Sequence, residues 1–273
     1  MSTPSKTPPR FLRVKRKQYL APNLMRITLS GEALAGFPEN SDGSHIKLML
    51  PRPEQIDPVL PTLGPDGPIW PPADQRPIVR TYSVSQYHLE AGELDVDFVL
   101  HGDNGPASSW AIHAEIGAGI GVAGPGGPER FQPNADWYLL IGDLSAYAAI
   151  AAVCRALPND ARGHILLEIS DETEQCPLPC PPGMALTWFS RDGARAGSSQ
   201  LLLNAVSALP WPSVPSVTLA GESTQIVLIR DWLMSEKGLP RNSFYAVPYW
   251  KDLQTEEAYH QERHRIMDEF EAE

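Results

Sequence analysis

The chain has little cysteine and no long apolar run. Three cysteines occur in 273 residues, and no stretch approaches the roughly 20 consecutive apolar residues that a membrane-spanning helix needs. The first ten residues are polar and contain no apolar segment of the kind found in secretory signals. We therefore expect a soluble, cytoplasmic protein without membrane insertion.

Positive charge is also scarce. The 33 acidic residues outnumber the 22 basic ones, which gives a formal net charge of -11 and a pI of about 5.1. An excess of negative charge repels nucleic-acid phosphates and anionic lipids, so we expect neither nucleic acid nor an anionic membrane as a partner. The length is ample for a buried core, in one large domain or two modest ones.

The cysteines do not form a metal-binding pattern. Cys154 lies in an alanine-rich helical segment and is most simply a small buried residue. Cys176 and Cys180 could supply half of a metal site, but no second Cys or His pair with ligand spacing lies nearby. We expect no metal site, and the sequence assigns no role to Cys176 or Cys180.

The first half of the chain has the pattern of a β-barrel wall. Polar and apolar residues alternate in several short segments, which is typical of half-buried strands. The predicted strands are 12–17, 24–30, 45–50, 81–84, 94–100 and a closing strand within 117–128. Between them, 51–77 contains nine prolines, which excludes a helix or a central strand. Lys47 stands among apolar residues and is either an outward surface lysine or a functional one.

Residues 80–110 carry the most informative chemistry. Strand alternation places Arg80 and Tyr82 on one face, with Thr81 and Ser83 on the other. A helix is expected to begin near Ala107, where backbone N–H groups without helical partners suit a phosphate. The set could hold a planar, phosphorylated cofactor. It could equally be an ordinary hairpin whose arginine forms a surface ion pair.

The motifs resemble those of a known family. Arg80-x-Tyr82-Ser83 is similar to the flavin motif of the ferredoxin-reductase superfamily, and the run from Arg80 through Asp-Phe-Val-Leu-His-Gly-Asp-Asn-Gly-Pro-Ala-Ser-Ser-Trp110 resembles the siderophore-interacting proteins. That family implies an FAD-dependent reductase of ferric siderophores. It also implies a six-stranded antiparallel FAD-binding barrel over 1–133, an NAD(P)H-binding α/β domain over 134–250 and a C-terminal helical extension over 251–273.

The resemblance assigns residues to the flavin. The implied cofactor residues are Arg80, Thr81, Tyr82, Ser83, Asp97, Val99, His101, Ala107, Ser108, Tyr249 and Trp250. In that assignment Arg80 holds the pyrophosphate and Tyr82 stacks on or flanks the ring system. Ala107 and Ser108 present N–H and hydroxyl groups to phosphate. Tyr249 and Trp250 would cover the cofactor, or would instead be buried aromatics that fill a gap between the domains.

Two positions depart from the family pattern. Ser83 stands where the family commonly has threonine, which preserves the hydroxyl. Ser85 stands where the family often has arginine, which leaves one phosphate or ribose contact in doubt.

The second half of the chain alternates strands and helices, which predicts a doubly wound parallel sheet. The expected strands are 137–141, 163–169, 186–189, 216–220 and 244–247. Ligands of such sheets bind beyond the carboxyl ends of the strands. No Gly-x-Gly-x-x-Gly occurs, so the strict dinucleotide fingerprint is missing.

The resemblance nevertheless assigns Gly142, Asp143, Gly221 and Glu222 to nicotinamide-nucleotide binding. Acidic Glu168 would favour a ribose hydroxyl over a 2′-phosphate, and hence NADH over NADPH. Arg191, at the end of the next predicted strand, is the counter-argument, because it could reach a phosphate.

The predicted substrate is a ferric siderophore, often an anion. Lys47, Arg130 and Lys251 match the family's basic substrate residues, although each could be ordinary surface charge. Two other functions stay open. One is a flavin reductase that exchanges electrons with a ferredoxin, and the other is a non-catalytic siderophore-binding protein.

Overall fold

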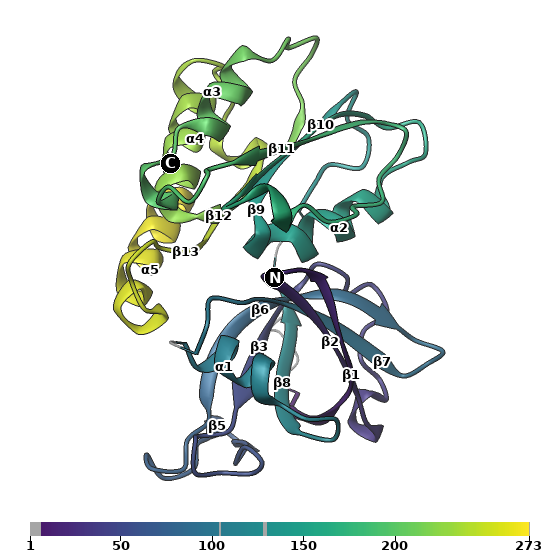
Figure 1. Ribbon diagram of the computed structural model, residues 1–273, viewed down its shortest axis with the longest axis vertical. Coiled ribbons are helices and arrows are strands. Elements are labelled where there is room, and N and C mark those ends of the chain that lie inside the picture. Colours follow the sequence, from purple (N-terminus) through teal and green to yellow (C-terminus); the bar gives the residue numbers. More distant parts are fainter. Residues whose placement is uncertain (1–6, 104, 128–129, 273) are drawn as a thin grey trace. The chain divides into compact units, whose positions relative to one another are not determined.

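The computed structural model describes residues 7–103, 105–127 and 130–272. The chain divides after Gly127 into two compact units, coloured purple to teal and teal to yellow in Figure 1. The predicted domain limits, with a boundary after residue 133 and a separate extension from residue 251, stay a proposal.

The first unit is a closed barrel of six antiparallel strands, in the order β1-β2-β7-β6-β3-β8. The strands are β1 (Arg10–Ala21), β2 (Leu24–Ser30), β3 (His45–Leu50), β6 (Ile78–His88), β7 (Glu93–Val99) and β8 (Gly119–Gly126). This confirms the predicted barrel. Strands β1 and β6 run further than predicted because their pairing continues to the hairpin turns, where Ala21 meets Leu24 and His88 meets Glu93.

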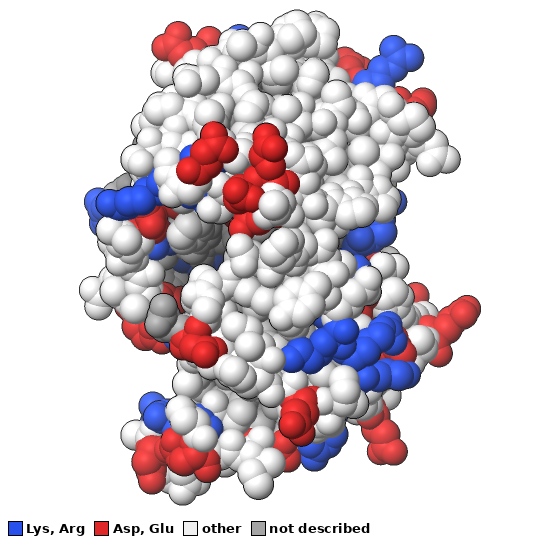
Figure 2. Space-filling view, viewed as in Figure 1, with Lys and Arg blue, Asp and Glu red and all other residues white. Residues whose placement is uncertain are grey.

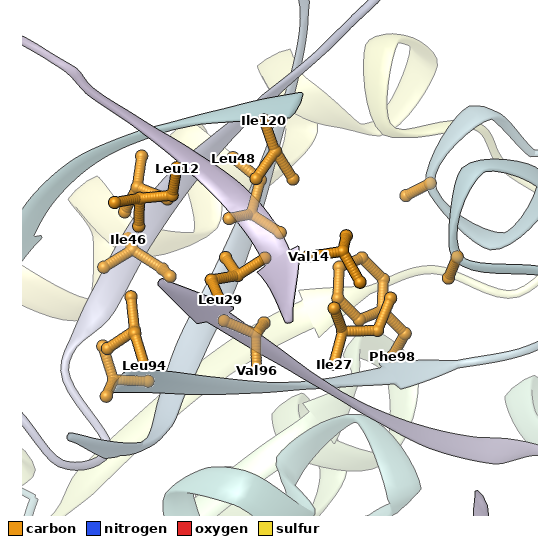
Figure 3. Close-up of a cluster of buried hydrophobic side chains, with 14 of the residues drawn as sticks. Leu12, Val14, Ile27, Leu29, Ile46, Leu48, Leu94, Val96, Phe98 and Ile120 are labelled. Carbon is orange, nitrogen blue, oxygen red and sulfur yellow. The ribbon is translucent and has the colours of Figure 1, made fainter. Parts of the chain in front are cut away.

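Alternation along the strands fills the barrel with apolar side chains. In β1, Leu12 and Val14 are buried while Arg13 and Lys15 are exposed. The labelled side chains inside the barrel in Figure 3 are Leu12, Val14, Ile27, Leu29, Ile46, Leu48, Leu94, Val96, Phe98 and Ile120. Burying this apolar surface is the main contribution to the stability of the unit.

Charged side chains gather in places on the outside of the barrel unit. Figure 2 shows Lys and Arg side chains gathered over the region of β1 and β2. On β1, Lys15 and Arg16 both pair with Glu93, each at 2.6 Å. The hydrogen bonds from Arg16 and Lys15 lower the pKa of Glu93 to about 2. Opposite charges are thus interspersed on this surface.

Two connections of the barrel bear on the site. The proline-rich segment contains a small hairpin, β4 (Thr62–Gly64) and β5 (Gly67–Ile69), and neither a helix nor a barrel strand. After β7, helix α1 (Pro106–His113) begins with proline at its first position, where a missing N–H costs no hydrogen bond. Lys17 of β1 donates to the carbonyl oxygens of Ile112 and Ala114, at 2.9 and 3.0 Å, and so fixes the end of α1.

The second unit is a five-stranded parallel sheet in the order β11-β10-β9-β12-β13, which confirms the predicted doubly wound arrangement. The strands are β9 (Tyr138–Asp143), β10 (Arg162–Ile169), β11 (Gly183–Ser190), β12 (Ser216–Glu222) and β13 (Tyr245–Trp250). The helices are α2 (Tyr147–Ala156), α3 (Leu201–Ala208), α4 (Ser223–Ser235) and α5 (Glu256–Ala272). Short 3₁₀ turns lie at 32–34, 144–146, 172–174, 196–198 and 241–243.

Helices cover both faces of this sheet. Side chains of α3, α4 and α5 share one hydrophobic cluster with the sheet, and α2 lies on the other side (Figure 1). The predicted C-terminal helix is confirmed as α5, with Tyr259 and Ile266 buried as its periodicity predicts. The side chain of Phe270, predicted on the same stripe, lies outside the described residues. No helix in the described part of the chain is long and apolar enough to cross a membrane.

Candidate functional site

The β6 motif has the two faces that alternation predicts. Arg80 is opposite Leu48 in the register with β3, and Tyr82 is opposite Ile46. Directly paired residues share a face of the sheet, so Arg80 and Tyr82 lie on the face that carries the barrel core. The partly exposed ring of Tyr82 packs against Phe98, with 4.6 Å between ring centroids. The motif therefore presents an aromatic ring that packs on the barrel core through Phe98.

The other face of β6 brings two predicted functional residues together. The ammonium of Lys47 on β3 donates to the hydroxyl of Thr81 at 2.5 Å, and the two residues are register partners. Lys47 is exposed, whereas Ser83 on the same face is buried. A residue assigned to the substrate thus lies beside one assigned to the cofactor.

Asp97 is an internal anchor of the barrel wall. Its carboxylate accepts two hydrogen bonds from Arg26, at 2.7 and 2.8 Å, and one from the Ser85 hydroxyl at 2.8 Å. The Asp97 side chain is 2% exposed, so these bonds occupy a carboxylate that is shielded from solvent.

The sequence analysis did not predict the role of Arg26. Its guanidinium also donates at 2.7 Å to the hydroxyl of Ser85, the residue that stands where the family often has arginine. A serine there leaves room for a cation from β2, which lies beyond β7, and that departure was the available signal.

The loop before α1 is held by Ser108. Its hydroxyl accepts from the backbone N–H of His101 at 3.0 Å and donates to the Gly102 carbonyl at 2.7 Å. Ser108 is fully buried, and its hydroxyl shapes this loop; the predicted contact of Ser108 with a phosphate stays a prediction. The N–H groups of Ala107 and Ser108 lie in the first helical turn, where N–H groups have no partner within the helix.

Gly105 lets His101 pack over the start of α1. A Cβ at Gly105 would lie 2.5 Å from Cε1 of the His101 ring, so a side chain there would force the ring to move. His101 itself is exposed, and Val99 at the end of β7 is partly exposed.

The donor set of the barrel unit fits FAD. Arg80 offers a fixed cation, the first turn of α1 offers N–H groups at the positive end of a helix dipole, and Tyr82 offers a supported ring. A dinucleotide that carries a pyrophosphate and a planar ring system needs these three kinds of group.

At the carboxyl edge of the parallel sheet, Asp143 joins three strand ends. One carboxylate oxygen accepts from the backbone N–H of Ser145 at 2.8 Å. The other accepts from the N–H of Glu222 at 2.8 Å and from the indole N–H of Trp250 at 2.9 Å. Asp143 ends β9, and its two partners end β12 and β13. The structure thus brings three predicted ligand-binding residues into direct contact.

Two of the predicted nucleotide residues are glycines because the backbone is crowded there. A Cβ at Gly142 would lie 2.6 Å from the carbonyl oxygen of Ala220. A Cβ at Gly221, where φ is +144°, would lie 2.7 Å from the Asp143 carboxylate. These glycines are required for the strand ends to approach one another, whatever else they bind.

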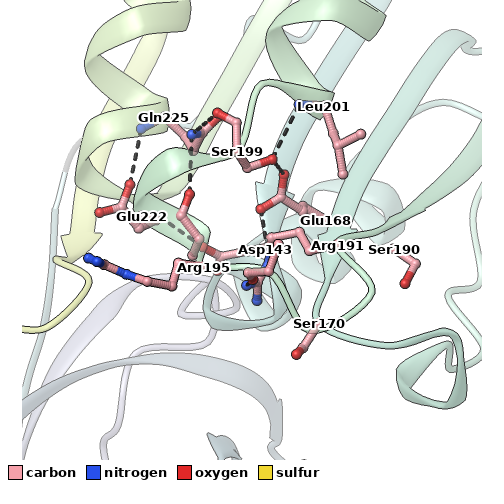
Figure 4. A network of polar contacts seen from close by, with 12 residues as sticks. Asp143, Glu168, Ser170, Ser190, Arg191, Arg195, Ser199, Leu201, Glu222 and Gln225 are labelled. Atoms are coloured by element: carbon pink, nitrogen blue, oxygen red, sulfur yellow. Dashed lines mark hydrogen bonds and ion pairs between the residues drawn. The ribbon is translucent and has the colours of Figure 1, made fainter.

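Glu222 caps helix α4. One of its carboxylate oxygens accepts from the N–H groups of Thr224 and Gln225, at 2.7 and 3.1 Å, and the other accepts from the N–H of Asp252 at 3.1 Å. Asp252 in turn pairs with Arg195 at 3.1 Å, a cation at this edge that the sequence analysis missed. Figure 4 shows Asp143, Glu222 and Arg195 from neighbouring segments.

Glu168 is buried among polar partners (Figure 4). It is 3% exposed, accepts a hydrogen bond from the Ser199 hydroxyl, and lies 3.1 Å from Nε of Arg191. Burial, reinforced by the charges of Asp143 and Glu222, raises its pKa to about 7 although Ser199 and Arg191 oppose the shift. A carboxylate so enclosed does not support the predicted preference for NADH, and Arg191 is held by it.

The remaining predicted residues lie around β13. The Tyr249 hydroxyl is 3.2 Å from that of Tyr245, and Lys251 pairs with Glu262 of α5 at 3.1 Å. The carbonyl oxygen of Arg130 accepts a hydrogen bond from Thr218 at 2.5 Å. Among the described residues, no group of three or more His, Cys, Asp or Glu side chains is placed to hold a metal ion.

A closed antiparallel barrel followed by a doubly wound parallel sheet defines the ferredoxin-reductase-like fold class. A ferredoxin reductase of carbazole 1,9a-dioxygenase shares this fold with a TM-score of 0.65 at 16% identity, covering 89% of this chain and 67% of that one. The sequence matches a siderophore-interacting FAD-binding domain over residues 13–129 and a siderophore-interacting protein over residues 135–253. The chain therefore belongs to the siderophore-interacting protein family.

Individual relatives agree. The ferric vibriobactin reductase ViuB of Vibrio cholerae is 41% identical over 264 residues, which is 96% of each chain. The siderophore-interacting protein SipS of Aeromonas hydrophila superimposes with a TM-score of 0.84 at 38% identity, covering 97% of this chain and all of that one. A siderophore utilization protein from T. fusca gives 0.80 at 32% identity, covering 92% and 96%.

Proposed function

We propose that this protein is an FAD-dependent oxidoreductase that reduces ferric siderophores and releases Fe(II), with electrons from NAD(P)H. The observation that carries the proposal is the set of Arg80, Tyr82 and the α1 N-terminus on one barrel, in a chain similar over its length to a ferric siderophore reductase. A bound flavin supplies exchange between a two-electron donor and a one-electron acceptor such as Fe(III).

The protein's own residues bind and orient. Arg80 would balance the charge of the cofactor's phosphates, the first-turn N–H groups of α1 would donate hydrogen bonds to them, and Tyr82 would support the ring system. Arg26, Asp97 and Ser85 keep the barrel wall rigid behind these groups. Reduction needs no proton taken from the substrate, so His101 need not act as a base.

The substrate residues are part of the proposal. Lys47, Arg130 and Lys251 attract an anionic ferric chelate to an otherwise acidic protein. The assignment of 1–133 to FAD, 134–250 to the nucleotide and 251–273 to an extension belongs to the same proposal. So do the cytoplasmic location and the alternative of a ferredoxin as electron donor.

An anaerobic absorbance titration tests the proposal. NADH and NADPH are added separately to the purified protein, followed by a ferric siderophore and a ferrous trap. We expect bleaching by one nucleotide and recovery of the flavin spectrum as trapped Fe(II) appears. Bleaching by dithionite alone would indicate a protein donor, and a colourless protein unable to take up FAD would exclude the flavoenzyme.

A further inference from the structure

Two histidines stand side by side on the last helix. His260 and His264 are separated by four residues on α5, which places them one turn apart on the same side of the helix. Their ring centroids are 4.5 Å apart, and the ring planes meet at 37°. Both residues are exposed.

The pair faces away from the buried side of the helix. Tyr259 and Ile266 anchor α5 in the core of the second unit, with exposures of 2% and 7%. At 3.6 residues per turn, the histidine pair lies roughly 130° around the helix from that stripe. The imidazoles can therefore turn toward a ligand in solvent without disturbing the core.

Neutral imidazole is a preferred ligand of divalent transition metals. Histidines at i and i+4 are the spacing by which a helix offers two imidazoles to one ion. The described residues supply no third His, Cys, Asp or Glu placed to join them, so water would complete the coordination. Glu256 and Asp268 stand one turn before and one turn after on the same side, and their charges favour a cation nearby.

We propose that His260 and His264 chelate one divalent transition-metal ion on the surface of α5. Such a site is open and exchanges its ion readily, because two protein ligands leave most coordination positions to water. Under the proposed function, Fe(II) is the ion of this class that the protein itself generates. That clause rests on the proposed function, whereas the metal site does not.

Calorimetric titration of the untagged protein with NiCl₂ tests the site, in the absence of flavin reductant, nucleotide and siderophore. We expect one ion per chain and a Kd at least tenfold weaker in His264→Gln. In parallel titrations, Cu(II) should bind more tightly than Ni(II), and Fe(II), added under anaerobic conditions, should bind more weakly than Ni(II). Because turnover is not measured, failure of the reductase proposal would leave this result unchanged.

A rearranged variant is the matched control. His264→Gln combined with Gln261→His keeps the number of histidines but puts the pair on adjacent positions, which point about 100° apart on the helix. We expect it to bind as weakly as His264→Gln. His113→Gln removes an exposed histidine from α1 and should bind like the parent protein. Parent-like affinity in His264→Gln or in the rearranged variant would overturn the chelate.

Discussion

The indole N–H of Trp250 donates to the carboxylate of Asp143 at 2.9 Å, linking the ends of β13 and β9. The same oxygen accepts from the backbone N–H of Glu222 on β12. One side chain therefore fastens three of the five strands at the edge where the nucleotide is proposed to bind.

Replacing Asp143 should destabilise the second unit. Asp143→Ala leaves the N–H groups of Glu222 and Trp250 without an acceptor, and we expect a loss of about 1–3 kcal/mol in the free energy of unfolding. Urea unfolding measures it. Exposed Asp136 is the control, because Asp136→Ala should change stability by less than about 0.5 kcal/mol. Equal effects of the two substitutions would contradict the proposed anchor.

Arg26 should be needed for stability while Asp97 is present, and should be dispensable once Asp97 is also replaced. Arg26→Met leaves the buried carboxylate of Asp97 without its cation. We expect a loss of about 3–5 kcal/mol in the free energy of unfolding, together with lower flavin content. The double variant Arg26→Met, Asp97→Leu removes both charges and should regain most of the stability. Chemical denaturation and the flavin-to-protein absorbance ratio report the two effects.

Lys15→Met is the comparison for Arg26. Lys15 forms a short ion pair on the same barrel, but it is half exposed. Screening by solvent limits such a pair to about 1 kcal/mol or less. A loss from Lys15→Met as large as that from Arg26→Met would show that burial of Asp97 is not the cause.

The stability of the protein should respond to Glu168 between pH 4.5 and 7. The folded-state pKa of about 7 lies above the ordinary 4.5, so the folded protein holds a proton that the unfolded chain releases. Stability contributed by this proton is present at low pH and is lost as the pH rises through this window, by up to roughly 1.4 kcal/mol per pH unit. Glutamine does not titrate, so Glu168→Gln should lose less stability than the parent between pH 5 and pH 8.

Unfolding curves of Glu168→Gln at both pH values provide the measurement. Exposed Glu172 serves as the control, and Glu172→Gln should parallel the parent at both pH values. A Glu168→Gln profile that runs parallel to the parent would show that the carboxyl titrates normally.

Lys47 should act on the substrate and not on the cofactor. Lys47→Ala removes a cation beside Thr81, and we expect KM for anionic ferric chelates to rise about tenfold, as loss of one charged contact predicts. Flavin content should be unchanged. Steady-state kinetics at two salt concentrations distinguish the cases, because added salt should raise KM in the parent more than in the variant. Unchanged KM would remove Lys47 from the substrate site.

Local pattern predicted the strands well, and long-range pairing explains what it missed. Alternation assigns a face to Arg80 and Tyr82, but it does not reveal which residue of another strand lies opposite. The contact of Arg26 with Asp97 depends on the register of β2 with β7. The local backbone partners of the Ser108 hydroxyl were also not visible in the sequence, although serine side chains often form such bonds. The burial of Glu168, which was predicted to meet a ribose hydroxyl, could not be foreseen because the sequence does not show what covers it.

The closure of the barrel has a consequence for its synthesis. Strand β1 pairs with β2 at once, but its other edge waits for β8, since Arg10 pairs with Val122. Until then β1 presents an open strand edge, the kind of surface on which chains aggregate. Its outward Arg13, Lys15 and Arg16 place like charges along that edge. Like charges on such an edge disfavour its pairing with another copy of the chain until β8 closes the barrel.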